Sequence, residues 1–211
     1  MKNLIIIGAR GYGREVYYLA KDCQDARKEF VVKGFLDDKE DALAAFEDYP
    51  PIISPVESYE PGPDDVFICA LGKVDDKIRY SQMISDKGGT FISLVHPAVR
   101  IPKTTTLGVG CIIWEYVVVS SGVSIGNFVD VQTYSVIGHD CTVGDWCHLG
   151  PFVFLGGKVK IGNGAQINPR AAVLPRITIG TKAVVGTGSV VIRHVKPNTT
   201  VFGNPAKKTN L

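Results

Sequence analysis

The sequence has few of the features that mark secreted, membrane-spanning or metal-binding proteins. The apolar run that ends at Gly8 is only four residues long, too short for a secretion signal or a membrane span. The five cysteines are odd in number and form no CxxC pair, which argues against a disulfide framework and a structural zinc site. A formal net charge of +2, with no basic cluster beyond Lys207–Lys208, argues against nucleic-acid binding. Free thiols and the missing export signal predict a cytoplasmic protein.

Apolar residues make up 45% of the chain, which is enough for a hydrophobic core. Within residues 1–95, sequence patterns typical of strands alternate with patterns typical of helices. Strands are expected over 4–8, 31–38, 66–72 and 91–95, and helices over 13–22 and 75–86. The proline-rich stretch 49–65 reads mostly as a connection. This alternation predicts an α/β domain, half of a Rossmann-like fold, with a parallel sheet and right-handed crossovers.

From Val99 onward the period of the sequence changes to six residues. In sixteen consecutive hexads, from Ile101 to Val191, the third residue is Ile, Leu or Val, and the fourth is Gly in nine of them. Such a repeat predicts a parallel β-helix over residues 96–195, with three hexads in each 18-residue coil and coils about 4.8 Å apart. We expect the fourth-position glycines to supply unusual backbone conformations at the corners. Residues 196–211 are expected to form a C-terminal tail.

A glycine-rich loop, GARGYG, follows the first expected strand and opens a helix. Backbone N–H groups bind phosphate in this context, although the order GxxGxG differs from the dinucleotide fingerprint GxGxxG. Asp37 and Asp38 follow the second expected strand, where a carboxylate can accept hydrogen bonds from a ribose or a base. The loop therefore favours a nucleotide-containing ligand, and the alternative is a tight turn beside a solvated acidic pair.

The hexad register places three polar side chains on the outside of the β-helix. His139 and Asp140 occupy hexad positions five and six, at a corner, and His148 occupies position two, where a side chain points outward. A carboxylate beside a histidine is typical of a general base, and three polar groups on one coil favour this over simple solvation.

The 18-residue coil also predicts which residues are neighbours. Gly157 is expected one coil along from His139, with its N–H open to an oxyanion or an amide, and Pro169 and Thr187 are expected to share one edge. Cys141 and Cys147 fall at position one of their hexads, where they are expected to be packing residues rather than nucleophiles. No His-x4-His pair is present, and no metal is expected.

The loop GARGYG, the stretches SLVHPAVRI and IGHDCTVGD, and the ending VFGNPAK together resemble the bacterial nucleotide-sugar acetyltransferases. These are the sialic-acid O-acetyltransferase-like hexapeptide-repeat acyltransferases, which include the UDP-4-amino-sugar N-acetyltransferases. The resemblance covers nearly the whole chain. It implies a left-handed β-helix, acetyl-CoA as co-substrate, a nucleotide sugar held by residues 1–95, and a homotrimer with active sites at the subunit interfaces.

The resemblance also implies roles for individual residues. His139 would be the general base, and Asp140 would increase its basicity. Acetyl-CoA would contact His148, Gly157, Pro169 and Thr187. The nucleotide sugar would contact Arg10, Gly11, Tyr12, Asp37, Asp38 and Gly72. The chain departs from the family where Arg10 and Tyr12 replace small residues and where Thr187 replaces a glycine.

The leading hypothesis is acetyl transfer to the amino group of a nucleotide-activated amino sugar, a UDP-4-amino-dideoxy sugar, for surface glycan biosynthesis. The first alternative is O-acetylation of a sialic acid or another sugar hydroxyl. The second is a nucleotide-binding or scaffolding trimer without activity, against which the His139–Asp140 pair argues.

Overall fold

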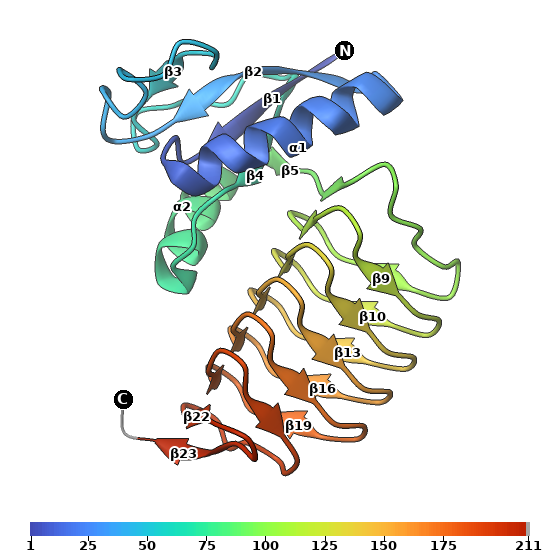
Figure 1. Cartoon of the computed structure of the whole chain (residues 1–211). Helices are drawn as coiled ribbons and strands as arrows, with labels where there is room; N and C mark the ends of the chain where they lie inside the picture. Colours follow the sequence, from blue (N-terminus) through green and yellow to red (C-terminus); the bar gives the residue numbers. More distant parts are fainter. Residues whose placement is uncertain (210–211) are drawn as a thin grey trace. The chain divides into compact units, whose positions relative to one another are not determined.

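The computed structural model describes residues 1–209 and divides into two compact units, Met1–His96 and a second unit that begins at Pro97. The first unit is a parallel sheet with the strand order β3-β2-β1-β4-β5 and two helices (Figure 1). Its elements are β1 (Lys2–Ile7), α1 (Gly11–Arg27), β2 (Phe30–Leu36), β3 (Ile52–Ser54), β4 (Asp65–Cys69), α2 (Val74–Asp86), β5 (Thr90–Phe91) and β6 (Leu94–Val95).

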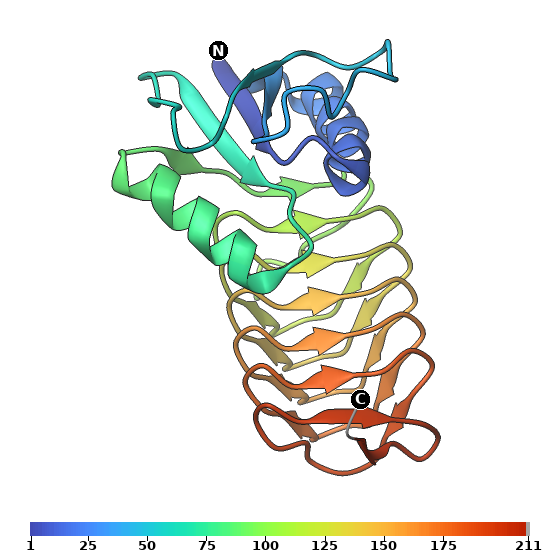
Figure 2. The ribbon, with the colours of Figure 1, turned by 90° about the vertical axis from the view of Figure 1, so that its left-hand side faces the viewer.

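The apolar pattern explains why this unit forms layers. The run Leu4–Ile7 in β1 is fully buried, as a central parallel strand covered on both faces requires. Helix α1 buries Val16, Leu19, Ala20 and Cys23, which recur at helical spacing on one side. Figure 2 shows α1 and α2 on opposite sides of the sheet, the arrangement that right-handed crossovers produce.

The expected elements of this unit are present, with different bounds. Helix α1 is longer at both ends than the predicted 13–22. The stretch 49–65 contains the short edge strand β3, and the predicted strand 91–95 is divided between β5 and β6. These differences lie at element ends and edges, where the hydrophobic period is weakest.

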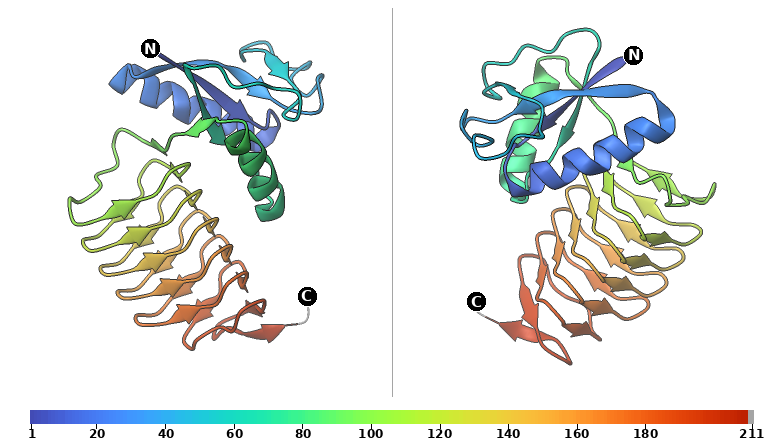
Figure 3. Two further views of the ribbon diagram at one scale, coloured as in Figure 1. Left: turned by 180° about the vertical axis from the view of Figure 1, so that it is seen from behind. Right: turned by 45° about the horizontal axis from the view of Figure 1, so that its top comes forward.

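The second unit is a left-handed parallel β-helix (Figure 1). Each strand pairs with the strand 18 residues later, as Val136 pairs with Phe154 and Asp130 with His148. The strands are β7 (Thr106–Leu107), β8 (Ile112–Ile113), β9 (Val118–Val119), β10 (Ser124–Ile125), β11 (Asp130–Val131), β12 (Val136–Ile137), β13 (Thr142–Val143), β14 (His148–Leu149), β15 (Phe154–Leu155), β16 (Lys160–Ile161), β17 (Gln166–Ile167), β18 (Ala172–Val173), β19 (Thr178–Ile179), β20 (Val184–Val185) and β21 (Val190–Val191). They stack into three sheets along the coil axis (Figure 3).

Hexad positions one and three fill the interior. Ile137, Val143 and Leu149 at position three are at most 1% exposed. Cys141 and Cys147 at position one are buried, which explains the thiols as small core residues. The Cys141 thiol donates to the Gly156 carbonyl at 3.1 Å, as the Ser135 hydroxyl, one hexad earlier, donates to the Gly150 carbonyl.

The reason expected for the fourth-position glycines is wrong. The left-handed backbone conformation occurs at position six, mostly in residues other than glycine, including Asp140 with φ of 58°. At position four the neighbouring coil leaves no room for a side chain: a Cβ on Gly138 would lie 2.7 Å from the Leu155 carbonyl oxygen. These glycines are therefore needed for the close approach of successive coils, not for backbone freedom.

The segment predicted as a tail contains two strands. Strand β22 (Thr200–Phe202) pairs in parallel with β20, and β23 (Lys207–Thr209) pairs antiparallel with β22. Within residues 1–209, no helix is both long enough and apolar enough to cross a membrane.

Candidate active site

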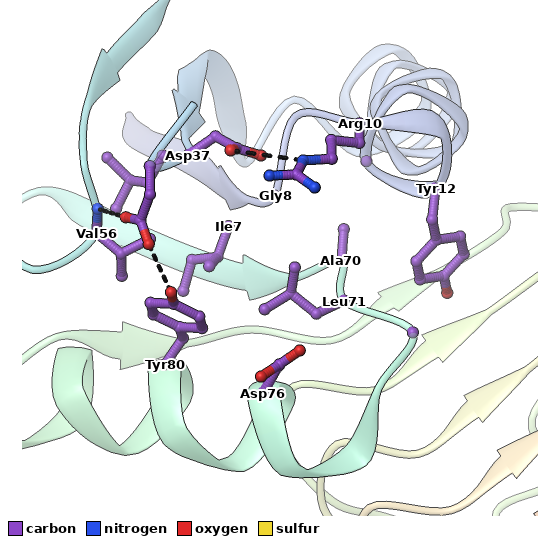
Figure 4. Close-up of a pocket in the computed structure, with 14 residues that line it drawn as sticks. Ile7, Gly8, Arg10, Tyr12, Asp37, Val56, Ala70, Leu71, Asp76 and Tyr80 are labelled. Atoms are coloured by element: carbon purple, nitrogen blue, oxygen red, sulfur yellow. Dashed lines mark hydrogen bonds and ion pairs between the residues drawn. The ribbon is translucent and has the colours of Figure 1, made fainter. Parts of the chain in front are cut away.

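A cavity of about 300 Å³ opens at the carboxyl ends of β1, β2 and β4 in the first unit (Figure 4). This is where open α/β sheets bind ligands. Five of the residues predicted for the nucleotide sugar line it: Arg10, Tyr12, Asp37, Asp38 and Gly72. Gly11 is the first residue of α1 and is not part of the lining.

Asp37 holds the glycine-rich loop in place. Its carboxylate accepts hydrogen bonds from the Ala9 N–H and the Lys39 N–H, each at 2.9 Å. The Arg10 guanidinium lies 3.9 Å from the same carboxylate and is 72% exposed, so it keeps its freedom to contact a ligand. Asp37 thus shapes the glycine-rich loop as well as facing the cavity.

Asp38 is fixed by the opposite wall of the cavity. It accepts a hydrogen bond from the Tyr80 hydroxyl at 2.5 Å and one from the Val56 N–H at 3.2 Å (Figure 4). The hydrogen bond to Asp38 raises the pKa of Tyr80 above its ordinary value, so the phenol stays protonated as a donor. In the same view Tyr12 points away from this pair.

Sequence reasoning missed Asp76 and Tyr80, which also line the cavity. They lie four residues apart on α2, so they share one face of that helix. The spacing of four residues could have shown that Asp76 and Tyr80 share a face of α2. It could not have shown that this face lines the cavity, because that depends on how the helix packs.

In the second unit, His139 and Asp140 form a hydrogen bond at the turn between β12 and β13. His139 Nδ1 lies 2.9 Å from Asp140 Oδ2, and both side chains are more than half exposed. The hydrogen bond with His139 holds the pKa of Asp140 below its ordinary value, so Asp140 is a carboxylate at neutral pH. A carboxylate only accepts hydrogen bonds, so Nδ1 carries a proton and Nε2 of a neutral His139 is the basic nitrogen.

The other nitrogen of His139 faces Gly157. A Cβ on Gly157 would collide with His139 Nε2, so only glycine leaves room for the ring here. The neighbouring N–H groups of Gly156 and Lys158 donate to adjacent coils, to Val173 and His139. The predicted relationship of one coil between His139 and Gly157 is therefore present in the structure.

His148 belongs to a different cluster. It lies on β14, and its Nδ1 is 2.8 Å from Asp130 Oδ2 on β11. His139 follows β12, which belongs to another sheet. The expectation that His139, Asp140 and His148 lie close together on one coil is therefore wrong. One hexad separates the hexads of the two histidines, so His139 and His148 face different sides of the triangular coil.

The other residues predicted for acetyl-CoA lie at two corners. Pro169 lies between β17 and β18, and Thr187 lies between β20 and β21 on the same edge, where the Gly188 N–H donates to the Pro169 carbonyl. Gly157 lies between β15 and β16, on another edge. Over residues 1–209 no group of three or more His, Cys, Asp or Glu side chains is placed to bind a metal.

Two family models match the chain. The PglD N-terminal domain matches residues 3–84, and the bacterial transferase hexapeptide repeat matches residues 122–157 and 158–193. Together they cover more than half of the sequence. The first match lies within the first structural unit and the second within the second unit. The chain belongs to the hexapeptide-repeat nucleotide-sugar acetyltransferases.

Solved structures agree with this family. The chain is similar to PerB from Caulobacter crescentus in complex with CoA and GDP-perosamine, with 25% identity, coverage of 100% of this chain and 98% of PerB, and a TM-score of 0.90. It is similar to the acetyltransferase domain of PglB from Neisseria gonorrhoeae in complex with acetyl coenzyme A, with 26% identity, 99% coverage of both chains and a TM-score of 0.88. No curated protein sequence matches the chain.

The enzyme class expected from the sequence is confirmed by these matches. The protein is an acetyl-CoA-dependent sugar N-acetyltransferase. The family also confirms the expected fold, an α/β domain followed by a left-handed β-helix.

Proposed function

We propose that this acetyltransferase moves the acetyl group of acetyl-CoA to the amino group of a nucleotide-activated amino sugar, a UDP-4-amino-dideoxy sugar, in surface glycan biosynthesis. The observation that carries the proposal is the His139–Asp140 pair, whose ring faces Gly157 at an exposed corner. An acid–base pair in this position has no structural task, because the coil-to-coil hydrogen bonds here use the backbone.

The chemistry follows from the hydrogen-bond pattern. His139 Nε2 takes a proton from the sugar amine as the amine nitrogen attacks the thioester carbon. The new C–N bond forms, a tetrahedral oxyanion collapses, and the C–S bond breaks. The proton on His139 passes to the departing CoA sulfur, which restores the enzyme. Asp140 keeps the proton on Nδ1 and stabilises the imidazolium between these steps.

Gly157 is the nearest backbone donor for the oxyanion. Its N–H lies between two N–H groups that are used by neighbouring coils, beside the ring of His139. Preorganised backbone donors of this kind commonly contribute about 3 kcal/mol to transition-state stabilisation. This role needs no movement of the β-helix.

The cavity of the first unit suits the nucleotide part of the substrate. The Arg10 guanidinium and the start of α1 supply positive potential for a diphosphate. Asp38 and Asp76 supply acceptors for the N–H and O–H groups of a base and a ribose. PerB was solved with GDP-perosamine, which supports an amine as the acetyl acceptor. The test must therefore compare substrates that carry different nucleobases.

A homotrimer would complete the site. Gly157 and the Pro169–Thr187 edge are at different corners of one β-helix, so a long ligand that touches both must lie between two copies. One sheet has a suitable surface: its outward residues are all apolar, namely Val118, Val136, Phe154, Ala172 and Val190. By contrast, the β7–β10–β13–β16–β19 sheet presents Thr106, Ser124, Thr142, Lys160 and Thr178.

Acetyl-CoA and nucleotide sugars are both cytoplasmic metabolites, which supports a cytoplasmic enzyme.

The test is a substrate panel followed by mass spectrometry. The enzyme is incubated with acetyl-CoA and with UDP- and GDP-linked 4-amino sugars, sialic acid and its CMP ester. The proposal predicts a mass gain of one acetyl group on a UDP-linked 4-amino sugar, in an amide that resists mild alkali. Acetylation of sialic acid alone, in an alkali-labile ester, would establish the O-acetyltransferase instead.

A further inference from the structure

A buried carboxylate outside the His139 corner has no assigned role. Asp130 lies on β11 at hexad position two, where side chains point outward, yet it is only 1% exposed. The side chains of His148, Trp114 and Gln132 cover it and bind it. Elsewhere in the same sheet this position holds Ile112, Gln166 and Val184, which carry no charge.

Asp130 is held by donors on every side. Trp114 Nε1 donates to Oδ1 at 3.2 Å, and Gln132 Nε2 donates to Oδ2 at 3.0 Å. His148 Nδ1 completes the set at 2.8 Å from Oδ2. A buried carboxylate with this many donors is stabilised in its charged form, so it acts as an acceptor only.

This arrangement fixes which nitrogen of His148 carries a proton. Because Asp130 cannot donate, the hydrogen of the short contact belongs to Nδ1. The neutral imidazole therefore has its lone pair on Nε2. The His148 side chain is 29% exposed, so its ring reaches the surface while the carboxylate behind it does not.

We propose that Asp130 is a positioning residue that holds His148 with the Nε2 lone pair directed at an N–H donor of acetyl-CoA. The pantetheine arm of acetyl-CoA has secondary amide N–H groups, whereas the acetyl thioester has no donor, so His148 binds the arm and not the reacting carbonyl. This inference rests on the proposed function for acetyl-CoA as co-substrate, and on the sequence resemblance for its contact with His148. It separates the two histidines: His139 acts on the reacting atoms, and His148 anchors the co-substrate.

The first experiment reads the tautomer directly. The chain has only four histidines, so nitrogen–proton correlation spectra of protein labelled at histidine resolve each ring. In Asp130→Asn, Trp114 and Gln132 compete for the single amide oxygen, which turns the amide NH2 toward His148. The expected result is that the His148 proton moves from Nδ1 to Nε2, while Asp140→Asn changes His139 and leaves His148 as it is. An unchanged His148 pattern in Asp130→Asn overturns the proposal.

The second experiment separates positioning from a general structural effect. Asp130→Asn is expected to raise the KM for acetyl-CoA and the calorimetric Kd for CoA at least tenfold, with kcat and the KM for the sugar within twofold of wild type. Trp114→Phe, which removes one donor but keeps the His148–Asp130 bond, is expected to stay within threefold in all four values. Equal losses in kcat and in both KM values would show that Asp130 only supports the fold.

A third measurement needs no variant. Adding CoA to the labelled wild-type protein is expected to shift the Nε2 resonance of His148 while Nδ1 remains protonated. A shift without acetyl transfer to any sugar would keep this inference and reject the proposed function. Saturating CoA binding without any change at His148 would reject the inference and leave the proposed function standing.

Discussion

The ring of His139 lies directly against the backbone of Gly157, one coil further along the β-helix, so that a single methyl group on Gly157 would meet His139 Nε2. The repeat that builds the scaffold thus also sets the distance between the proposed base and a backbone N–H. The 18-residue coil makes this relationship rigid, because both residues lie at position five of hexads on the same edge.

Gly157→Ala tests this relationship. The new Cβ meets the end of an exposed side chain rather than backbone, so the melting temperature is expected to change little. The displaced ring loses its alignment, and kcat is expected to fall about 100-fold, the usual scale of general-base catalysis. If Gly157 acts through His139, the double variant with His139→Ala loses no more activity than His139→Ala alone. Additive losses would show that the two residues act independently.

Asp140→Asn tests the pairing of the base. Asn tolerates the left-handed backbone of residue 140, where φ is 58°, so this variant leaves the corner intact. An amide can donate to Nδ1 and permits the wrong tautomer of His139, so kcat is expected to fall about 100-fold or more while the Kd for CoA is unchanged. Steady-state kinetics and calorimetry measure these values, and wild-type kcat in this variant would remove Asp140 from the mechanism.

Asp65 tests the electrostatics of the first unit, away from the site. Burial alone would raise the pKa of Asp65, but hydrogen bonds from Tyr59, Gly62, Asn3 and Lys33 outweigh it and hold the pKa at about 2. A lowered pKa stabilises the fold above the unfolded value near 4, and this stabilisation is lost as the pH falls toward 2.

Asp65→Asn is therefore expected to cost about 2 kcal/mol of unfolding free energy at pH 7. Urea unfolding of the variant and of wild type should show this difference shrinking between pH 4 and pH 2. Asp64→Asn is the matched control, because Asp64 is an exposed neighbour with one ion pair to Lys2. A difference that does not depend on pH would contradict the charge-based origin.

Phe154→Lys tests the apolar sheet as the subunit interface. Phe154 is 45% exposed at position two of β15, and Val118, two strands away in the same sheet, is 54% exposed. The charge of a lysine in a packed interface would have no partner. Sedimentation velocity is therefore expected to show the proposed trimer dissociating, and activity is expected to fall with it. Thr142→Lys makes the same kind of change on the polar sheet and is expected to leave the assembly intact. An unchanged trimer in Phe154→Lys would assign the interface to another face.

The sequence predicted most reliably what depends on the six-residue register. The burial of Ile137 and Leu149, the interior position of Cys141 and the neighbours His139 and Gly157 all follow from counting. The same arithmetic reaches Asp130, which is 18 residues before His148, so this partner could have been found.

Other features depend on packing that the register does not describe. The separation of His139 and His148 onto different sheets requires the triangular path of the coil, not only outward or inward direction. Glycine is required at position 138 because the next coil lies too close for a side chain, and local propensities do not describe this distance. Tyr80 reaches Asp38 because α2 presents that face to the cavity, a matter of tertiary packing.

The most direct test of the account is single-turnover acetyl transfer by His139→Ala, with acetyl-CoA and the sugar that the wild-type enzyme acetylates. The variant is expected to bind CoA with wild-type affinity and to transfer acetyl at least about 100-fold more slowly, because it lacks the proposed base. Wild-type transfer rates in His139→Ala would contradict the account.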